Sequence, residues 1–264
     1  NKMKVYFIGA GPGDPELITV KALKRINQCP IILYAGSLVP REVLAEAEET
    51  AELILDTASM NLDEIIEIME KAKAQNKNVA RVHSGDPSIY GATGEQMRRL
   101  DELDIEYETI PGVTAVAASA AWLNKELTLS GVTQTVIFTR YEGKTPFPER
   151  ERLPALAAVG ATLAIHLGIT RIHKIVEELI PFYGKNCPVA VCYRTSWPDE
   201  QKITSTLEHI VEKVRAEKIT RTALIIVGQV LNANEFDESY LYDENKAHVY
   251  RPKLKPAKPR TVKR

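Results

Sequence analysis

The sequence predicts an α/β protein with two α/β domains, the N-terminal one built on a mostly parallel sheet and the C-terminal one on a mixed sheet. Short apolar segments alternate along the chain with segments of helical period, which is typical of βαβ units. Some strand segments of the first half, such as 5–8, Val-Tyr-Phe-Ile, are continuously hydrophobic, as in strands covered on both faces. In the second half two such segments are separated only by the polar turn 196–201, which indicates an antiparallel hairpin.

The N-terminal domain is expected to contain five strands, at residues 4–11, 31–35, 53–56, 79–84 and 106–110. Between them lie segments with apolar residues at three- and four-residue spacing. One such helix face consists of Leu62, Ile65, Ile66, Ile68 and Met69. Pro111 and Gly112 end the fifth strand, and an alanine-rich helix follows at 113–123.

The C-terminal domain is expected to contain five more strands, at 135–139, 161–166, 189–193, 202–205 and 223–227. Helical patterns lie between most of them, at 152–158, 171–180 and 207–216. We therefore expect the N-terminal domain to span 1–113, a linker helix region 114–127 and the C-terminal domain 128–240. A basic flexible tail is expected at 241–264.

Composition indicates an ordinary folded protein, with 44% hydrophobic and 26% charged residues. No stretch approaches the roughly 20 consecutive apolar residues of a membrane span, and we see no signal peptide. We therefore expect a cytoplasmic protein with no membrane partner. Cys29, Cys187 and Cys192 have no CxxC spacing, which predicts reduced, buried thiols and neither a disulfide framework nor a metal site.

Positive charge is concentrated at the end of the chain. Residues 245–264 include eight Lys and Arg and no Asp or Glu, whereas the formal net charge of the whole chain is -1. The rest of the chain therefore carries -9. An acidic body disfavours an enzyme that binds nucleic acid through a broad basic face, so no nucleic-acid partner is expected. The tail either is solvated or touches acidic partners.

A glycine-rich loop, Gly9-Ala10-Gly11-Pro12-Gly13-Asp14, joins the first strand to a helix. It differs from a dinucleotide fingerprint because Asp14 occupies the third glycine position, where its carboxylate would repel a pyrophosphate. The second strand also ends without the acid that would bind a ribose. Two interpretations remain: a packing turn in which Asp14 caps a helix begun by Pro15, or a loop that lines a cleft.

Two further loops follow strands of the first half. The loop 84–91, Ser-Gly-Asp-Pro-Ser-Ile-Tyr-Gly, lies at the sheet edge where open α/β proteins bind ligands. Gly85 permits close approach of the backbone, Asp86 offers a carboxylate to an amino group or to hydroxyls, and Gly91 opens the next helix. The loop 111–115, Pro-Gly-Val-Thr-Ala, repeats this arrangement after the fifth strand. So many turn residues in eight positions favour a ligand site over a simple helix cap.

The three loops, in this order and spacing, resemble those of the tetrapyrrole (corrin/porphyrin) methyltransferase family. The pattern is GAGPGD near the N-terminus, GDPxIYG after the fourth strand and PGVTA after the fifth, and the resemblance extends over about 4–231. It implies two α/β domains, a homodimer, and S-adenosyl-L-methionine held in a cleft between the domains. This cofactor has no phosphate, which agrees with the missing dinucleotide fingerprint.

The resemblance also assigns site residues. Cofactor contacts are implied for Pro12, Ser84, Gly85, Asp86, Ile89, Thr114, Ala115, Leu167, Arg194 and Ala223. Relatives often have Met where this chain has Leu167. Substrate contacts are implied for the first loop, at Gly11, Gly13 and Asp14, and for Ser37.

Two segments are similar to those of family members that methylate C-11 of precorrin-4 in cobalamin biosynthesis. They are 34–39, Tyr-Ala-Gly-Ser-Leu-Val, and 139–149, Thr-Arg-Tyr-Glu-Gly-Lys-Thr-Pro-Phe-Pro-Glu. Relatives that act on uroporphyrinogen carry an acid where this chain has Ala35, so an early-pathway substrate is not expected. Relatives acting on the metal-free and on the cobalt-bearing macrocycle share both segments, and we favour the cobalt form. Methylation at C-17 or C-20 of a precorrin is the alternative.

Methyl transfer from a sulfonium to a macrocycle carbon is a direct displacement, so the main work of the enzyme is positioning. No metal or covalent intermediate is required, and a general base is optional. No residue stands out as this base. His166, at the end of a strand, and Glu142 are weak candidates, since residues of this kind are more often structural.

The anionic substrate carries acetate and propionate groups, with which basic residues of the 139–152 stretch could pair. Arg140 and Lys144 are the main candidates, and Arg150 and Arg152 lie nearby. The alternative is a solvated loop in which glutamates of the same stretch are the partners of these residues.

Three other functions were weighed against this interpretation. A nicotinamide-dependent oxidoreductase is disfavoured by the missing third glycine and ribose-binding acid. A related methyltransferase acting on a ribosomal RNA ribose or on a modified histidine of a protein is disfavoured by the acidic body and by the 141–149 stretch. A non-enzymatic tetrapyrrole carrier is disfavoured by the two domains and by the set of loops suited to a cofactor. Such a carrier would bind pigment with no dependence on S-adenosylmethionine.

Overall fold

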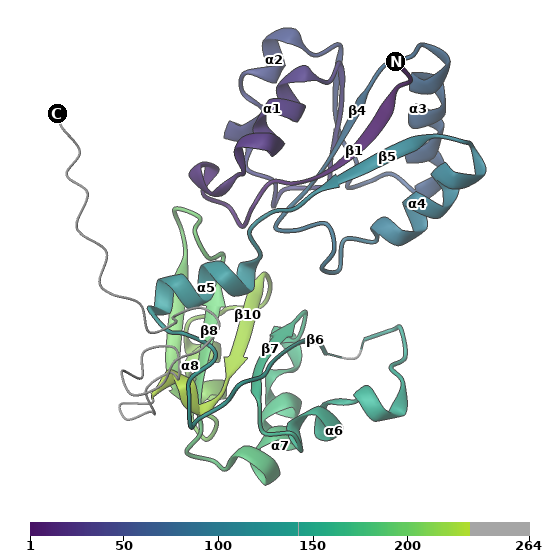
Figure 1. The fold of residues 1–264 in the computed structure, drawn as a ribbon. Coiled ribbons are helices and arrows are strands. Elements are labelled where there is room, and N and C mark those ends of the chain that lie inside the picture. Colours follow the sequence, from purple (N-terminus) through teal and green to yellow (C-terminus); the bar gives the residue numbers. More distant parts are fainter. Residues whose placement is uncertain (142, 233–264) are drawn as a thin grey trace, which may run out of the picture.

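The structure is a computed structural model that describes residues 1–141 and 143–232. Within these residues the chain forms two five-stranded sheets with helices packed on them (Figure 1). This confirms the predicted α/β class. Glu142 and the predicted tail at 241–264 lie outside the described residues. In the part of the chain that the structure covers, no helix combines the length and the apolar character needed to cross a membrane.

The first sheet is parallel throughout, with the strand order β3-β2-β4-β1-β5. Its strands are β1 (Lys4–Gly9), β2 (Ile31–Tyr34), β3 (Leu53–Asp56), β4 (Val79–His83) and β5 (Glu106–Ile110). Its helices are α1 (Val20–Gln28), α2 (Ala47–Thr50), α3 (Leu62–Ala74) and α4 (Thr93–Glu102). The pair α1 and α2 covers one face and the pair α3 and α4 the other, each over its own apolar cluster (Figure 1). β2 and β4 are consequently buried along their whole length, which explains the unbroken apolar run of β2, whereas β4 also buries Arg81 and His83.

The second sheet is mixed, as predicted, with the order β6-β7-β10-β8-β9. Its strands are β6 (Val136–Arg140), β7 (Thr162–His166), β8 (Pro188–Tyr193), β9 (Gln201–Thr206) and β10 (Ala223–Val227). Only β6 and β7 pair in parallel, and β8 and β9 form the predicted antiparallel hairpin. Helices α6 (Leu153–Ala157), α7 (Ile172–Tyr183) and α8 (Ile210–Ala216) cover one face of this sheet. Short 3-10 helices lie at Pro15–Leu17, Arg41–Leu44, Glu149–Glu151, Ile169–Arg171 and Gln229–Leu231.

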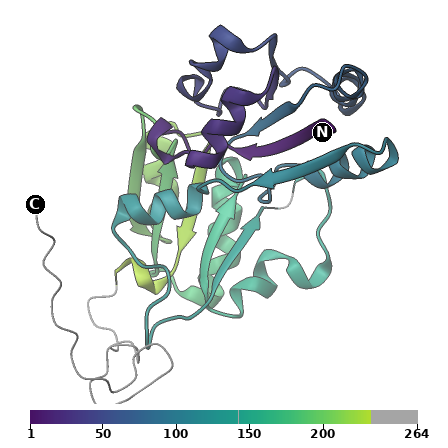
Figure 2. The same ribbon diagram turned by 45° about the horizontal axis from the view of Figure 1, so that its top comes forward.

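Helix α5 (Ala115–Leu123) connects the two sheets and packs on the second one, where Val116 joins the apolar cluster of Ala164 and Ala190 (Figures 1 and 2). It begins two residues later than predicted because Thr114 is its N-cap, with Oγ1 accepting a hydrogen bond from the Ala117 amide at 3.2 Å. The chain thus changes sheets between β5 and β6. The boundaries at 113 and 127 stay predictions.

The expectation that Gly91 opens a helix was wrong. Helix α4 begins at Thr93, after Ala92 in the left-handed conformation with a φ of 52°. Gly91 instead closes the preceding turn, since a Cβ there would lie 2.5 Å from the carbonyl oxygen of Pro87. A glycine before a helix is therefore explained here by a tight turn rather than by the helix start.

The order of the first sheet creates a topological switch point between β1 and β4. These two strands are neighbours, but the chain leaves them in opposite directions along the sheet. From β1 it continues to β2, on the β4 side, and from β4 it continues to β5, on the β1 side. The crevice at the carboxyl ends of such strands is where open α/β sheets bind ligands. All three predicted loops start at this edge, after β1, β4 and β5.

Glycine at four positions lets these loops meet backbone to backbone. Gly11 and Gly85 form an isolated antiparallel bridge, with hydrogen bonds of 3.2 Å from Gly11 N to Gly85 O and 2.7 Å from Gly85 N to Gly11 O. A Cβ on Gly112 would lie 2.1 Å from Gly85 O, and one on Gly9 would lie 2.6 Å from the same atom. No side chain fits at either position.

Gly112→Ala should therefore destabilise the protein, because the new methyl group would overlap backbone atoms of two other loops. We expect the free energy of unfolding, measured by urea denaturation, to fall by about 1–3 kcal/mol. The matched control is Gly94→Ala in α4, where nothing lies within 4 Å of the new Cβ. The control should be neutral or up to about 1 kcal/mol more stable. Equal stability of the two variants would contradict the packing argument.

Candidate functional site

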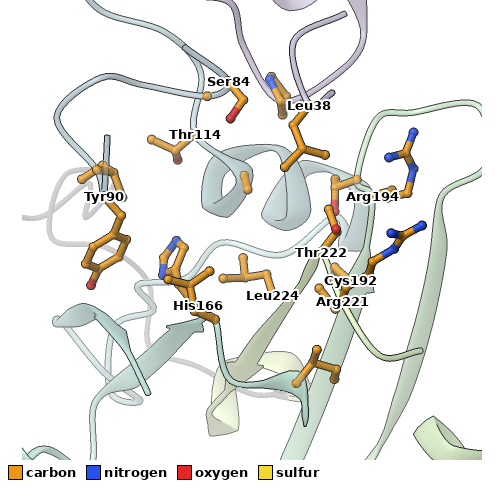
Figure 3. A pocket seen from close by; sticks show the side chains of 18 of the residues that line it. Leu38, Ser84, Tyr90, Thr114, His166, Cys192, Arg194, Arg221, Thr222 and Leu224 are labelled. Atoms are coloured by element: carbon orange, nitrogen blue, oxygen red, sulfur yellow. The ribbon is translucent and has the colours of Figure 1, made fainter. Parts of the chain in front are cut away.

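A cavity of about 540 Å³ lies between the two domains, beside the switch point (Figure 3). From the N-terminal domain it is lined by the loops after β1, β2 and β4, and from the C-terminal domain by the ends of β7, β8 and β10. The start of α5 closes it from the side. The volume is in the range of cofactor pockets.

The cavity gathers every residue that the family resemblance assigns to the cofactor. Its lining includes Pro12, Ser84, Gly85, Asp86, Ile89, Thr114, Ala115, Leu167, Arg194 and Ala223. These residues come from six segments that lie far apart in the sequence. Their convergence on one cavity makes the prediction geometrically consistent, while their role in binding stays a prediction.

Asp86 joins the second and third loops through its carboxylate. Oδ1 accepts a hydrogen bond from the Gly112 amide at 2.8 Å, and Oδ2 accepts from the Ser88 amide at 2.9 Å and from the Ser88 hydroxyl. Partial burial acts to raise the pKa of Asp86, but these hydrogen bonds outweigh it and hold the pKa below its usual value. Asp86 is therefore an ionised group that positions the loops as well as lining the cavity.

Several residues on the cavity wall have a backbone conformation that side chains disfavour. Tyr90, Leu167, Arg194 and Thr222 have φ values of 54°, 55°, 46° and 54°. Such strained residues cluster at functional sites, where the surrounding fold holds them in place. The Arg194 amide, for example, donates to the Thr222 carbonyl at 3.1 Å.

The glycine-rich loop rests on the turn between β8 and β9, which belongs to the other domain. The Asp14 amide donates to Ser196 Oγ at 2.9 Å, and a Cβ on Gly13 would lie 2.3 Å from Cδ1 of the Trp197 indole. The Arg194 guanidinium lies 4.3 Å from the centre of the Trp197 ring. Asp14 also caps the 3-10 helix Pro15–Leu17, so the two interpretations of this loop are both partly right: it caps a helix and it packs at the edge of the cavity.

The six residues predicted to contact substrate are not brought together. None of them lines the main cavity: Gly11, Gly13 and Asp14 make the contacts just described, and Ser37 precedes the lining residue Leu38. Arg140 lines a second cavity of about 190 Å³, and Lys144 lies on an exposed loop. Glu142, a predicted candidate for the base, lies outside the described residues.

His166, the other candidate for a base, lies on the wall of the main cavity beside Tyr90 (Figure 3). Burial lowers the pKa of His166 below its usual range, against the opposing effect of its backbone hydrogen bonds. The ring is therefore neutral at pH 7. Nδ1 lies 2.9 Å from the carbonyl oxygen of Thr139, so Nδ1 carries the proton and donates it, which leaves Nε2 unprotonated.

Sequence reasoning missed part of the cavity wall. The additional lining residues include Leu38, Tyr90, Ile169, Thr170, Cys192, Thr195, Trp197, Thr220, Arg221, Thr222 and Leu224. Tyr90 stood inside a recognised loop, and Thr222 directly precedes a predicted residue, so proximity was a usable signal for these two. Trp197 gave no signal, because an aromatic residue in a hairpin turn has many explanations.

The sequence also did not reveal a buried arginine beneath the second loop. Arg81 on β4 is 5% exposed, and its guanidinium donates to Gln96 Oε1 at 3.0 Å and to Thr57 Oγ1 at 2.8 Å. Burial lowers the pKa of Arg81 to about 10. Gln96 and Thr57 thus accept hydrogen bonds from the buried guanidinium. These bonds connect β4 to neighbouring segments directly below the loop 84–91.

Comparison with known proteins places the chain in a family. Residues 4–211 match the model of the Tetrapyrrole (Corrin/Porphyrin) Methylases. The chain belongs to the tetrapyrrole methylase family. Among these methylases it is 56% identical to the precorrin-4 C(11)-methyltransferase of Pseudomonas aeruginosa over 250 residues, covering 95% of this chain and 99% of that one. It is 52% identical to the cobalt-precorrin-4 C(11)-methyltransferase of Methanocaldococcus jannaschii, covering 95% of this chain and 97% of the relative.

Solved structures of tetrapyrrole methylases share the fold. The X-ray structure of a cobalt precorrin-4 methyltransferase matches with a TM-score of 0.84 and 44% identity, covering 88% of this chain and 97% of that one. The uroporphyrin-III C-methyltransferase of Thermus thermophilus, in a complex with S-adenyl homocysteine, matches with a TM-score of 0.72 and 30% identity. That comparison covers 86% of this chain and 98% of the other.

Asp86→Asn should weaken the connection between the second and third loops at neutral pH. We expect the free energy of unfolding to fall by about 1 kcal/mol, since the amide keeps the shape of the side chain but loses charge-assisted hydrogen bonds. Because the pKa of Asp86 is lowered in the folded state, the wild-type advantage is complete above the unfolded pKa near 4 and is lost as the pH falls through the folded pKa.

This pH dependence is measured by urea denaturation of both proteins between pH 3 and pH 8. The difference in unfolding free energy should be constant from pH 5 to pH 8 and should shrink in acid. A difference that grows towards acid pH would show that the carboxylate is not stabilised in its ionised form.

Proposed function

We propose that this protein transfers the methyl group of S-adenosyl-L-methionine to C-11 of precorrin-4 or of its cobalt form, a step of cobalamin biosynthesis. The convergence on one interdomain cavity of the ten residues that the family resemblance assigns to the cofactor carries the proposal. The names of the relatives from Pseudomonas aeruginosa and Methanocaldococcus jannaschii support the position on the macrocycle. We further propose that the protein works in the cytoplasm as a homodimer, with domains at 1–113 and 128–240.

The chemistry of the cavity suits a cationic nucleoside without phosphates. Its walls combine apolar side chains such as Leu38 and Leu224 with the hydroxyls of Ser84 and Thr114. Asp86 is the one carboxylate among the described lining residues, and its lowered pKa keeps it ionised. An ionised carboxylate attracts the ammonium and sulfonium groups of the methyl donor.

In the reaction the electron pair of C-11 forms a bond to the methyl carbon, and the pair of the broken S–C bond stays on sulfur. The products are the methylated macrocycle and S-adenosyl-L-homocysteine, and the macrocycle loses a proton afterwards. The protein holds the reacting atoms in line, an effect that reaches several kcal/mol when the geometry is fixed. The strained backbone at Leu167 and Arg194 and the carboxylate of Asp86 provide fixed walls for this purpose.

We propose that His166 receives that proton. Its Nε2 is unprotonated at neutral pH, because Nδ1 donates to the Thr139 carbonyl oxygen. Its lowered pKa makes it a weak base, which suits the removal of an acidic proton after methylation rather than activation of the nucleophile.

The first test is calorimetric titration with S-adenosyl-L-homocysteine, with NADH as the control ligand. We expect saturable binding of the first ligand alone, weakened by about 1–3 kcal/mol in Asp86→Ala. Methyl-transfer assays on precorrin-4 and on cobalt-precorrin-4 then identify the preferred macrocycle. Binding of NADH alone would overturn the proposal in favour of an oxidoreductase.

The pH profile tests the role of His166. The pKa of His166 lies below the usual value of about 6.5, so the ring is neutral at every pH above that value. We therefore expect kcat to be constant from about pH 7 to pH 9 and to fall only below about pH 6.5. His166→Gln should lose this acid limb and reduce kcat by at least tenfold while leaving the affinity for S-adenosyl-L-homocysteine nearly unchanged. An unchanged kcat would limit His166 to a structural role.

A further inference from the structure

Three large apolar side chains are exposed around His166, at one end of the main cavity. The exposed fractions of Tyr90, Phe138 and Leu167 are 48%, 41% and 74%. The centres of the Tyr90 and Phe138 rings lie 5.1 Å and 6.2 Å from that of His166. Tyr90, His166 and Leu167 line the main cavity, so this aromatic platform, defined by Tyr90, Phe138, His166 and Leu167, continues the cavity wall outwards. A contiguous exposed apolar surface of this kind marks a contact site.

The platform is open because α5 covers only part of its sheet face. In the parallel pairing of β6 and β7, Phe138 lies opposite Ala164 and Arg140 opposite His166. Side chains paired in this way share one face of the sheet. Ala164 is buried under α5 with residues of β8 and β10, whereas β6 is the edge strand and Phe138 remains exposed (Figure 1).

The second cavity, of about 190 Å³, places positive charge at the rim of this platform. Arg140 and Arg171 line it, and their guanidinium groups lie 4.6 Å and 5.4 Å from the centres of the Phe147 and Tyr141 rings. In the described part of the chain neither arginine has a carboxylate within ion-pair distance. Arg140 also acts electrostatically on the phenol of Tyr90, whose pKa burial raises and the guanidinium lowers, so the cationic cavity adjoins the platform.

Acidic residues in the second cavity do not cancel this charge. Glu151 and Glu178 line it, but Arg152 and Lys174 line it as well. The lining thus holds four basic side chains and two carboxylates, and Glu178 Oε2 is buried without a hydrogen-bond partner in the described part of the chain. Arg140 and Arg171 line this cavity, and each guanidinium lies near an aromatic ring.

A flat apolar ring with carboxylates at its edge fits this arrangement. Aromatic and aliphatic side chains pack against the face of such a ring, and guanidinium groups bind carboxylates through two parallel hydrogen bonds. We propose that the face of the macrocycle lies on the aromatic platform and that one of its carboxylate arms enters the second cavity, where Arg140 and Arg171 bind it. This rests on the function proposed above, and it makes Phe138 and Arg171 specificity residues that contact substrate but not cofactor.

Steady-state kinetics of Phe138→Ala and Arg171→Ala test this assignment. Each variant should raise the KM for the macrocycle about tenfold, the loss expected for one buried ring contact or one charged hydrogen-bond pair. The dissociation constant of S-adenosyl-L-homocysteine, from calorimetry, should stay within about twofold of the wild type, because neither residue lines the main cavity. The matched controls are Phe182→Ala and Arg215→Ala, which remove an exposed ring and an exposed cation elsewhere in the same domain.

Ionic strength separates a direct carboxylate contact from a structural effect. Added KCl should raise the KM of the wild type more steeply than that of Arg171→Ala, since the variant has lost a screened ion pair with the substrate. Identical salt dependence, or an unchanged KM in both variants of an active enzyme, would overturn the proposal. A change in oligomeric state of Phe138→Ala on size-exclusion chromatography would also overturn it, because a second copy of the chain would then cover this face.

The proposal and the underlying function fail in different ways. If the wild-type protein binds no S-adenosyl-L-homocysteine and methylates neither macrocycle, the proposed function is wrong. If the wild-type protein is active and the variants match their controls, the function stands and the platform assignment is wrong.

Discussion

The close backbone contact among the three loops at the end of the first sheet is the constraint on which the site depends. Gly85 O lies where a Cβ on Gly9 or Gly112 would have to be, so the loops after β1, β4 and β5 meet only because these positions are glycine. The contact brings Ser84, Asp86 and Thr114 to one edge of the cavity. Asp86 then fixes the arrangement, since its carboxylate accepts from amides of two loops at once.

The C-terminal domain supplies the opposite wall through strained backbone rather than through long side chains. Leu167 and Arg194 occupy left-handed conformations that persist only where neighbouring structure holds them. For Arg194 that support is visible in its stacking on Trp197 and its hydrogen bond of 2.9 Å to Asp199. Because Trp197 also rests on Gly13, the same turn sets the separation of the two domains across the cavity.

The sequence predicted the fold well because each strand is a short apolar run bounded by turn residues. All ten strands lie within two residues of their predicted ends, and the hairpin at 196–201 identified the second sheet as mixed. The convergence of the predicted cofactor residues on one cavity was also predictable, since the loops that carry them have ordered motifs. Arg81, Trp197 and Phe138 were not predictable, because their roles arise from tertiary neighbours that no local pattern encodes. Substrate contacts were predicted for the glycine-rich loop and Ser37 and also for Arg140 and Lys144. Of these, only Arg140 lies among the exposed apolar and basic groups that gather on β6 and at the start of α7.

The predicted cofactor residues and the proposed substrate contacts lie on different structural elements, which bears on specificity. The three loops at the N-terminal side of the main cavity meet through close glycine contacts, which tolerate few substitutions whatever the substrate. The platform and the second cavity are built from side chains on an edge strand and a helix start, where replacement costs little stability. A fold of this kind can keep one methyl donor and exchange one macrocycle for another by altering β6 and the 139–152 stretch. The sharing of one fold by methylases named for uroporphyrin and for precorrin-4 agrees with this division.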